Sequence, residues 1–369
     1  MSSLINILDQ MTVQGELYEN LSDNVLRCVA CAHRCKISPG KRGICQVRFN
    51  DGGELRVPWG YVAALQADPI EKKPFSHVLP GATALTFGML GCDFHCGYCQ
   101  NWLTSQVLRD PSSDVAVSLV RQITPQEVVK AARRARAEVI VSSYNEPLIT
   151  SEWAVAIFKE AIASGMLCAF VSNGNATPEV LEYLKPYLSA YKVDLKSMQE
   201  KNYRSLGGVL QNVLETIQRA HDLGLWVEVV TLIVPGFNDS NEELFEAASF
   251  LHSVSADIPW HVTAFHKDYK MTTPQNTPSA TLLRAAELGR EAGLHYVYAG
   301  NLPGRVDEYE NTHCPGCNRV LIRRQGYVVT EYRLTAQGAC PSCGASVPGV
   351  WPENPRSVIL NGIGMPVPV

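Results

Sequence analysis

Three cysteines stand close together in the chain, and their spacing points to metal chemistry. Cys92, Cys96 and Cys99, the central cysteine set, form a C-x3-C-x2-C pattern. Three thiolates at this spacing can ligate three irons of a [4Fe–4S] cluster and leave the fourth iron open to a substrate or cofactor. The alternative is a zinc site, which needs a fourth protein ligand that His95 could supply. We favour the cluster, because the segments that follow in the chain fit the same chemistry.

Two further sets of four cysteines lie towards the two ends of the chain. The terminal cysteine set contains Cys314, Cys317, Cys340 and Cys343. Its two C-P-x-C pairs are typical of a zinc ribbon or a rubredoxin-like knuckle, which holds zinc or iron. The N-terminal cysteine set contains Cys28, Cys31, Cys35 and Cys45. Its uneven spacing is equally compatible with zinc and with a second iron–sulfur cluster.

Short apolar runs alternate with helical patterns from about residue 80 to residue 302. Strands are expected at 84–90, 138–143, 167–172, 190–195, 226–234, 260–265 and 295–299. Helices are expected at 125–137, 151–164, 177–187, 209–223, 240–253 and 279–292. Repeated β-α units of this length predict an α/β fold with a parallel sheet, and about six units fit a partial or complete (β/α) barrel. The central cysteine set follows the first of these strands, at the end where such barrels carry their chemistry.

The central cysteines, with Tyr98 as the aromatic residue before the last of them, resemble the signature of the radical S-adenosylmethionine (SAM) enzymes. The resemblance implies that the amino and carboxylate groups of SAM bind the open iron. It also implies that electron transfer cleaves SAM to methionine and a 5′-deoxyadenosyl radical. An electron donor such as flavodoxin or ferredoxin would then be a partner.

Other segments resemble the SAM-binding segments of this family, and most of them follow the expected strands. The matching residues are Tyr98, Tyr144, Asn145, Glu146, Ser172, Asn173, Asp194, Lys196, Val234 and His266. The segment after the second strand resembles the one that binds the SAM amino group, although it lacks the two glycines found there. The next two resemble a ribose-binding segment and an Asp-x-Lys segment. Val234 begins a segment like the one beside the adenine, and His266 stands where activating enzymes carry a histidine near SAM.

Each of these segments also has a purely structural explanation. Glu146 could belong to a capped turn, and Asp194 with Lys196 could form an ion pair at a strand end. Asn238 or Asp239 could be a helix N-cap, because both residue types are common there. His261 could be a satisfied histidine that lines the barrel.

The chain as a whole resembles the radical SAM member of the AmmeMemoRadiSam set, a relative of the pyruvate formate-lyase activating enzymes. The resemblance spans about residues 25 to 350 and is carried by the N-terminal cysteine set, residues 91–102, Tyr144 to Pro147, Pro259 to Met271, Val297 to Asn301 and the terminal cysteine set. It implies coupling to a Memo-like protein and an AMMECR-type protein. It does not identify the substrate.

Composition limits the other possibilities. The chain has 369 residues and a net charge of −4, which argues against a broad nucleic-acid footprint. No signal peptide and no apolar run of bilayer length is present, so no membrane partner is expected. Short cysteine pairs in such a chain indicate metal ligands in a reducing compartment, the cytoplasm. We expect a Cys-rich metal-binding segment at 1–75, a radical SAM barrel core at 76–302 and a zinc-ribbon or rubredoxin-like module at 303–369.

The most direct interpretation is a radical SAM enzyme that abstracts hydrogen from an unknown substrate. One alternative is an activating enzyme for a glycyl radical enzyme, which predicts SAM cleavage that depends on a partner protein. Another is a non-enzymatic iron–sulfur or zinc scaffold, or a nucleic-acid-binding protein that uses the ribbon, which predicts no SAM cleavage.

Overall fold

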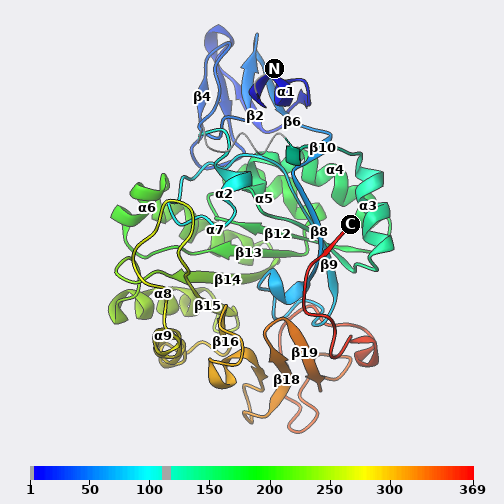
Figure 1. The fold of residues 1–369 in the computed structure, drawn as a ribbon, viewed down its shortest axis with the longest axis vertical. Coiled ribbons are helices and arrows are strands. Elements are labelled where there is room, and N and C mark those ends of the chain that lie inside the picture. Colours follow the sequence, from blue (N-terminus) through cyan, green and yellow to red (C-terminus); the bar gives the residue numbers. More distant parts are fainter. Residues whose placement is uncertain (1–3, 110–117) are drawn as a thin grey trace.

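A nine-stranded sheet forms the centre of this computed structural model, which describes residues 4–109 and 118–369 (Figure 1). Seven of its strands run parallel, in the order in which they follow one another in the chain. They are β9 (Thr83–Gly88), β11 (Val139–Ser142), β12 (Leu167–Ser172), β13 (Ala190–Asp194), β14 (Trp226–Ile233), β15 (Trp260–Ala264) and β16 (Val297–Gly300). All seven expected strands are confirmed, with ends within two residues of the expected bounds.

The parallel strands are buried on both faces, which explains their nearly continuous apolar sequences. All four residues of β11 and all five residues of β15 are buried. Polar residues gather instead where the strands end, and these ends carry the candidate site.

Helices connect the strands and pack against them. They are α3 (Pro125–Arg134), α4 (Ser151–Ile162), α5 (Pro178–Leu184), α6 (Glu200–Leu206), α7 (Leu210–Asp222), α8 (Asn241–Val254) and α9 (Ser279–Glu291). A capping box starts α3: Glu127 N donates to Thr124 Oγ1 at 3.2 Å, and Thr124 N donates to Glu127 Oε2 at 2.8 Å. The helix ends three residues before the expected bound, because Arg136 has a φ of 53°, which a right-handed helix excludes. Across the described ranges, every helix is too short or too polar to cross a bilayer.

The sheet stays open, so the barrel is partial. One edge consists of β8 (Ala64–Pro69), which pairs antiparallel with β9, and β20 (Val367–Pro368), which pairs antiparallel with β8. The other edge is β16, whose partner among the described strands is β15. The expected α/β fold is therefore confirmed, and of the two expected forms of the barrel the complete one is wrong.

Small antiparallel sheets lie towards both ends of the long axis of the molecule (Figure 1). Those near the N-terminus contain β1 (Thr12–Gln14), β5 (Phe49–Asp51), β6 (Glu54–Pro58), β2 (Tyr18–Asn20), β3 (Leu26–Cys28) and β4 (Lys36–Ile37). The sheet near the C-terminus contains β17 (Thr312–His313), β18 (Val320–Gln325) and β19 (Val328–Tyr332). The remaining helices and strands are α1 (Leu4–Asp9), α2 (Trp102–Ser105), β7 (Tyr61–Val62) and β10 (Arg121–Gln122).

A buried ion pair joins the N-terminal sheets to the barrel. The guanidinium of Arg48 donates two hydrogen bonds of 2.7 Å to the carboxylate of Glu152, at the start of α4. The exposed fractions of the two side chains are 1% and 2%. Burial alone would raise the pKa of Glu152, but the charge of Arg48 outweighs burial and the pKa is lowered. The ion pair therefore fixes the N-terminal cysteine segment relative to the barrel.

Candidate functional site

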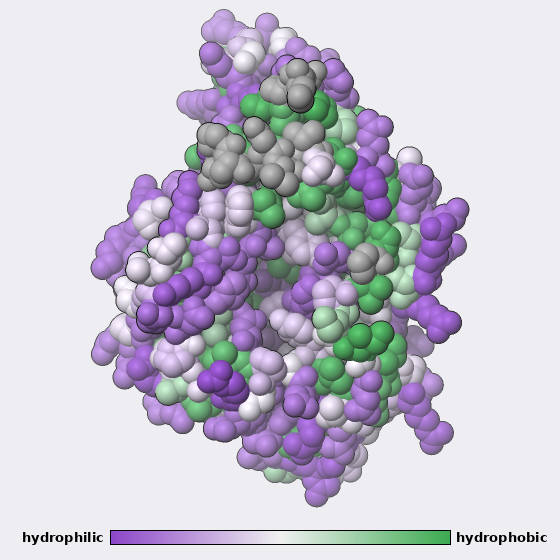
Figure 2. All heavy atoms as spheres, viewed as in Figure 1, coloured by the Kyte–Doolittle hydropathy of each residue, from purple (hydrophilic) through white to green (hydrophobic). Residues whose placement is uncertain are grey.

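The central cysteine set lies in the loop that follows β9, at the C-terminal end of the parallel sheet. Cys96 and Cys99 line a cavity of about 320 Å³. The loop is held by Arg109, whose Nη1 donates to the carbonyl of Phe94 at 2.7 Å, and by the amide of His95, which donates to the carbonyl of Leu206 at 2.9 Å. In the space-filling view the molecule is hollowed near the middle of the face shown, with hydrophilic residues around much of the rim (Figure 2).

The sulfurs of this set are spaced too widely for a single ion. Among the described residues, only the terminal cysteine set places three or more potential ligand atoms within 4.8 Å of one another. Zinc–sulfur bonds of 2.3 Å in a tetrahedron would hold sulfurs about 3.8 Å apart. A four-iron cluster separates its ligands further, because each thiolate binds a different iron. The loop therefore lacks the close packing of a single-ion site, and the zinc alternative with His95 is not supported.

Burial raises the pKa of the Cys96 thiol to about 12, and raises the pKa of Cys92 and Cys99 as well. These side chains ionise only if positive charge compensates the loss of water. Iron bound by these cysteines would provide that charge, because a coordinating metal ion deprotonates a thiol outright.

Asp93, which the sequence analysis did not single out, fastens the cysteine loop to the end of β12. Its carboxylate is fully buried and accepts hydrogen bonds from Asn173 Nδ2 at 2.7 Å and from Asn175 Nδ2 at 2.8 Å. Asn173 Nδ2 also lies 4.0 Å from the sulfur of Cys92. Asn173 is therefore placed beside the cysteine loop. No feature of the sequence marked Asp93 apart from its position between two cysteines.

The buried side chain of Glu146 links the ends of β11 and β12. Its carboxylate accepts hydrogen bonds from Ser172 Oγ at 2.7 Å, from the amide of Asn173 at 2.7 Å and from the amide of Leu148 at 3.0 Å. Burial, with the nearby charge of Asp93, raises the pKa of Glu146 to about 8. Glu146 does not line the 320 Å³ cavity. Its contacts thus favour a positioning role over direct contact with a ligand.

Tyr144 has a left-handed backbone conformation, with a φ of 71°. Bulky residues rarely adopt this conformation, and the family segment has glycines in this region. The tyrosine hydroxyl donates to Asp68 Oδ2 at 2.8 Å, and Lys73 Nζ lies 4.4 Å from the centre of the ring. Lys73 also pairs with Asp68 at 2.7 Å. The unusual backbone of Tyr144 is therefore held by a buried ion pair that the sequence analysis missed.

Asp194 and Lys196 lie at the end of β13 and line the 320 Å³ cavity, together with Lys192 and Tyr98. Asp194 pairs with Lys192 and also with Lys196, whose Nζ is 3.3 Å from Asp194 Oδ2. Burial would raise the pKa of Asp194, but the two lysines outweigh it and the pKa is lowered. The carboxylate is therefore charged and one-third exposed to the cavity.

The other predicted SAM-binding residues lie around this cavity rather than in its wall. Asn145 is buried, and its Oδ1 accepts from the amide of Met89 at 2.9 Å. The amide of Val234 donates to Asn238 Oδ1 at 2.7 Å. His266 is exposed and lines a neighbouring cavity of about 600 Å³.

His261 also lines the 600 Å³ cavity, but it is buried, and its Nε2 lies 2.7 Å from Glu228 Oε2. His261 is therefore a barrel-lining histidine with a satisfied hydrogen bond, which was the structural alternative for this residue.

The terminal cysteine set is close-packed. Cys314 and Cys343 have sulfurs 3.4 Å apart, and Cys317 and Cys340 have sulfurs 3.8 Å apart. These separations match the value of about 3.8 Å for four thiolates around one ion. The residues present fit a single zinc or iron ion.

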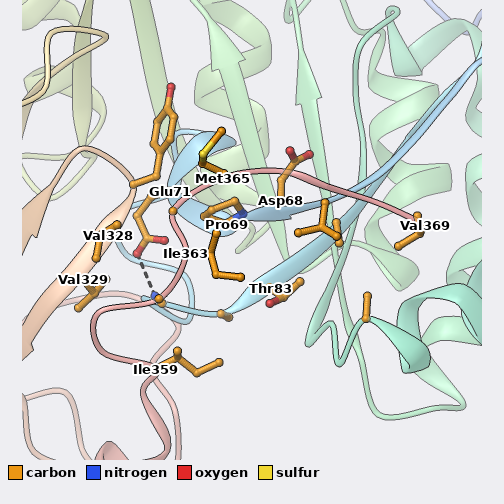
Figure 3. Close-up of a pocket in the computed structure, with 18 of the residues that line it drawn as sticks. Asp68, Pro69, Glu71, Thr83, Val328, Val329, Ile359, Ile363, Met365 and Val369 are labelled. Atoms are coloured by element: carbon orange, nitrogen blue, oxygen red, sulfur yellow. Dashed lines mark hydrogen bonds between the residues drawn. The ribbon is translucent and has the colours of Figure 1, made fainter.

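A third cavity, of about 560 Å³, lies beneath the C-terminal tail (Figure 3). Apolar side chains of the tail, including Ile363 and Met365, lie over β8 and β9, and Asp68 and Glu71 stand at its polar side. None of the cysteines lines it. This mostly apolar cavity is therefore separate from the metal chemistry.

The chain is similar to several known proteins. Residues 87–251 match the family model of the radical SAM superfamily, which covers the cysteine loop and the strand ends around it. The chain is 37% identical over 337 residues to an uncharacterised protein of Methanocaldococcus jannaschii, covering 90% of this chain and 98% of that protein. It is 25% identical over 201 residues to the pyruvate formate-lyase-activating enzyme of Staphylococcus aureus, covering 51% and 78% of the two chains. A structure of Streptococcus suis SuiB bound to S-adenosylmethionine is 13% identical with a TM-score of 0.45, over 65% of this chain and 55% of that one.

The protein is thus an enzyme of the radical SAM superfamily. Within it, the chain belongs to the same family as the uncharacterised Methanocaldococcus jannaschii protein. When bound, the [4Fe–4S] cluster and SAM supply reductive cleavage of SAM to a 5′-deoxyadenosyl radical, with a reductant such as flavodoxin or ferredoxin as the source of the electron. The central cysteines would hold the cluster, Asp93 and Glu146 fix the loop beside it, and the walls of the cavity exclude water.

Proposed function

We propose that this enzyme abstracts a hydrogen atom from a substrate bound in the 600 Å³ cavity beside the cysteine loop. The observation that supports this is a shared wall between the two cavities. The residues common to both are Lys72, Pro74, Gln100, Thr263, Asn301 and Tyr327. A substrate in the larger cavity would therefore adjoin a ligand held at Cys96 and Cys99. Cavities of this size accommodate small molecules.

The proposal assigns SAM to the smaller cavity. Asp194, Lys196, Tyr98 and the backbone of Tyr144 would contact it directly, since all four residues line the wall. Ser172, Asn173, Asn145, Glu146 and Val234 would shape the wall from behind through their hydrogen bonds. His266 would face the substrate side, because it lines the larger cavity.

We further propose that the chain is the radical SAM member of the AmmeMemoRadiSam set, with Memo-like and AMMECR-type proteins as partners. The motifs that resemble this set support the assignment. The chain would have three parts, at 1–75, 76–302 and 303–369, with metal in both outer parts and a zinc-ribbon or rubredoxin-like fold in the last. The twelve unpaired cysteines support a reducing, cytoplasmic location.

Isotope transfer tests hydrogen abstraction without knowledge of the substrate. The reconstituted enzyme is incubated anaerobically with SAM, reductant and an extract from cells grown in heavy water. The extract is divided by ultrafiltration into small molecules and proteins, and 5′-deoxyadenosine is analysed by mass spectrometry. We expect deuterium in 5′-deoxyadenosine with the small-molecule fraction. If neither fraction transfers deuterium, hydrogen abstraction is not the function.

The similarity to the Staphylococcus aureus activating enzyme favours a second candidate function, activation of a glycyl radical enzyme. That function would require a polypeptide backbone as the substrate. It predicts deuterium transfer with the protein fraction alone, accompanied by an organic radical signal in electron paramagnetic resonance (EPR).

A further inference from the structure

We propose that the N-terminal cysteine set holds a second [4Fe–4S] cluster, which passes an electron to the cluster of the central set. The proposal rests on the radical SAM activity of the protein and is independent of the substrate. It decides between the two metals that the sequence left open for this set.

The four cysteines of the set are brought together by local backbone bonds. The amide of Cys28 donates to the carbonyl of Cys35 at 3.0 Å, and the amide of Ile44 donates to the sulfur of Cys35 at 3.5 Å. Gly43, two residues before Cys45, packs on the same sulfur: a Cβ atom there would lie 3.6 Å from Cys35 Sγ. Cys28, Cys31 and Cys45 are buried, and Cys35 is partly exposed. Four cysteines gathered by these contacts are a candidate ligand set for a metal.

The spacing of the sulfurs distinguishes a cluster from a single ion. In the described part of the chain, the sulfurs of the terminal set all lie within 4.8 Å of one another, and no three sulfurs of the N-terminal set do so. In this respect the N-terminal set resembles the central set, which would hold the [4Fe–4S] cluster of a radical SAM enzyme, and differs from the terminal set. A single zinc ion, with sulfurs about 3.8 Å apart, would require this set to contract.

A buried histidine nitrogen, near the loop of the central set and without a hydrogen bond in the described ranges, supports the same assignment. The Nε2 atom of His33 is buried and makes no hydrogen bond with the described residues. It lies 4.0 Å from Asp93 Oδ2, in the loop of the central set. Hydrogen bonds to cluster sulfurs are one means by which proteins adjust the potential of iron–sulfur centres. An N–H at this position would be satisfied by a sulfur of a cluster.

The two sets also pack against each other. Gly91, which precedes Cys92, has a φ of +97°, and a Cβ atom there would lie 3.1 Å from the carbonyl oxygen of Cys45. The amide of Ala32 donates to the carbonyl of Asn175 at 2.8 Å, and Asn175 in turn binds Asp93. The backbone of one cysteine loop is therefore in contact with the other, which gives an electron a short path between them.

The transfer balances as a one-electron exchange. The N-terminal cluster changes from the 2+ to the 1+ state when it accepts one electron from an external donor of the flavodoxin or ferredoxin class. It returns to the 2+ state as it reduces the central cluster from 2+ to 1+. No atom or proton moves in this step. Cys35 and the exposed side chain of Ile44 lie at the surface, where such a donor could approach.

Metal counting tests the site itself. The wild type, the Cys92→Ala/Cys96→Ala/Cys99→Ala variant and the Cys28→Ala/Cys31→Ala variant are reconstituted anaerobically with iron and sulfide, and iron, sulfide and zinc per chain are measured. The Cys168→Ala variant is the control, because Cys168 is buried and belongs to none of the three sets. We expect about eight cluster irons in the wild type and the control, and about four in each of the other variants.

EPR assigns the remaining cluster in each variant. After reduction, the signal that persists without the central cysteines should not respond to SAM, whereas the signal that persists without Cys28 and Cys31 should. The proposal is overturned if the variant without the central cysteines binds zinc and no iron–sulfur cluster at its N-terminal set. It is also overturned if the wild type itself holds only about four cluster irons, a measurement that does not depend on how any variant folds.

The choice of reductant tests the electron transfer. The rate of SAM cleavage with reduced flavodoxin, divided by the rate with dithionite, should be at least tenfold lower in the Cys28→Ala/Cys31→Ala variant than in the wild type. An equal ratio in the two proteins would overturn the relay. A wild type with about eight cluster irons that fails to cleave SAM even with dithionite would contradict the radical SAM function instead, so the two failures are distinguishable.

Discussion

Two buried carboxylates, Asp93 and Glu146, organise the cysteine loop. Both accept hydrogen bonds from residues at the end of β12, Asn173 binds both of them, and Glu146 accepts a further one from the amide of Leu148. Neither carboxylate faces the cavity. The polar residues at the strand ends therefore act largely on one another, and the ligands meet a preformed wall.

Replacing Glu146 by alanine should disturb both stability and SAM binding. The substitution leaves two buried amides, those of Leu148 and Asn173, without an acceptor, at about 1–3 kcal/mol each. We expect the free energy of unfolding to fall by at least about 2 kcal/mol and SAM affinity to fall roughly tenfold. Denaturant unfolding and SAM titration of the cluster EPR signal measure the two effects. Wild-type values in both experiments would show that the hydrogen bonds of Glu146 contribute neither to stability nor to SAM binding.

Asp68 neutralises Lys73 beneath the ring of Tyr144. The side chain of Lys73 is 5% exposed, whereas that of Lys72, the other partner of Asp68, is 26% exposed. Asp68→Ala should therefore leave a buried cation unpaired and cost about 3–5 kcal/mol of unfolding free energy. The matched Lys72→Ala variant should lose less than about 1 kcal/mol. Similar losses from the two variants would contradict the importance of burial here.

At the scale of elements, a buried network joins the C-terminal sheet to the barrel. Tyr298, in β16, shares hydrogen bonds of 2.7 Å with His77 Nε2 and 2.8 Å with Thr312 Oγ1 in β17. Arg324 in β18 donates to Thr312 Oγ1 at 2.9 Å and to the carbonyl of Ser76 at 2.7 Å. The C-terminal sheet is thus positioned as one wall of the 600 Å³ cavity.

Metal at the terminal cysteine set should stabilise this module. Its core is small, and metal binding contributes folding free energy in modules of this kind. Cys314→Ser should release one metal ion and make the segment from residue 303 onwards sensitive to protease, while the central cluster remains. Metal analysis and limited proteolysis measure this. Unchanged metal content with a resistant segment would refute a structural metal at this set.

The stability of the contact between the C-terminal sheet and the barrel should depend on pH through His77. Burial lowers the pKa of His77 from 6.5 to about 4. Between these values the unfolded chain binds a proton that the folded chain does not, so stability is complete above pH 6.5 and falls as the pH drops towards 4. The loss can reach about 3 kcal/mol.

Chemical unfolding of the wild type and a His77→Phe variant, from pH 4.5 to 7.5, tests this dependence. The variant cannot be protonated at this position, so its stability should change less with pH. Parallel pH profiles would rule out a contribution from His77.

At the scale of the whole molecule, the parallel strands and the cysteine sets could be predicted because their signals are local. A buried strand such as β12 is apolar up to its last residue, Ser172, and cysteine spacing is visible in the sequence. The edge strands β8 and β20 were missed, because β8 contains polar residues and β20 pairs with it across some 300 residues. The Asp68–Lys73–Tyr144 contacts also depend on tertiary structure, which brings residues from two segments together.

The backbone of Tyr144 shows the same limit. The sequence revealed that the two glycines of the family segment were missing, but it could not show that a tyrosine adopts the left-handed conformation instead. Such a conformation persists where surrounding contacts determine it, and here those contacts come from Asp68 and Lys73.

Formation of 5′-deoxyadenosine is the most direct test of the central claim. The wild type, the Cys168→Ala control and the Cys92→Ala/Cys96→Ala/Cys99→Ala variant are reconstituted anaerobically and incubated with SAM and dithionite, and the nucleoside is quantified by mass spectrometry. We predict release of 5′-deoxyadenosine by the wild type and the control, and none above background by the variant, because all three cysteines share one cluster. Release at the wild-type rate by the variant, or none by a fully loaded wild type, would contradict a radical SAM centre at these cysteines.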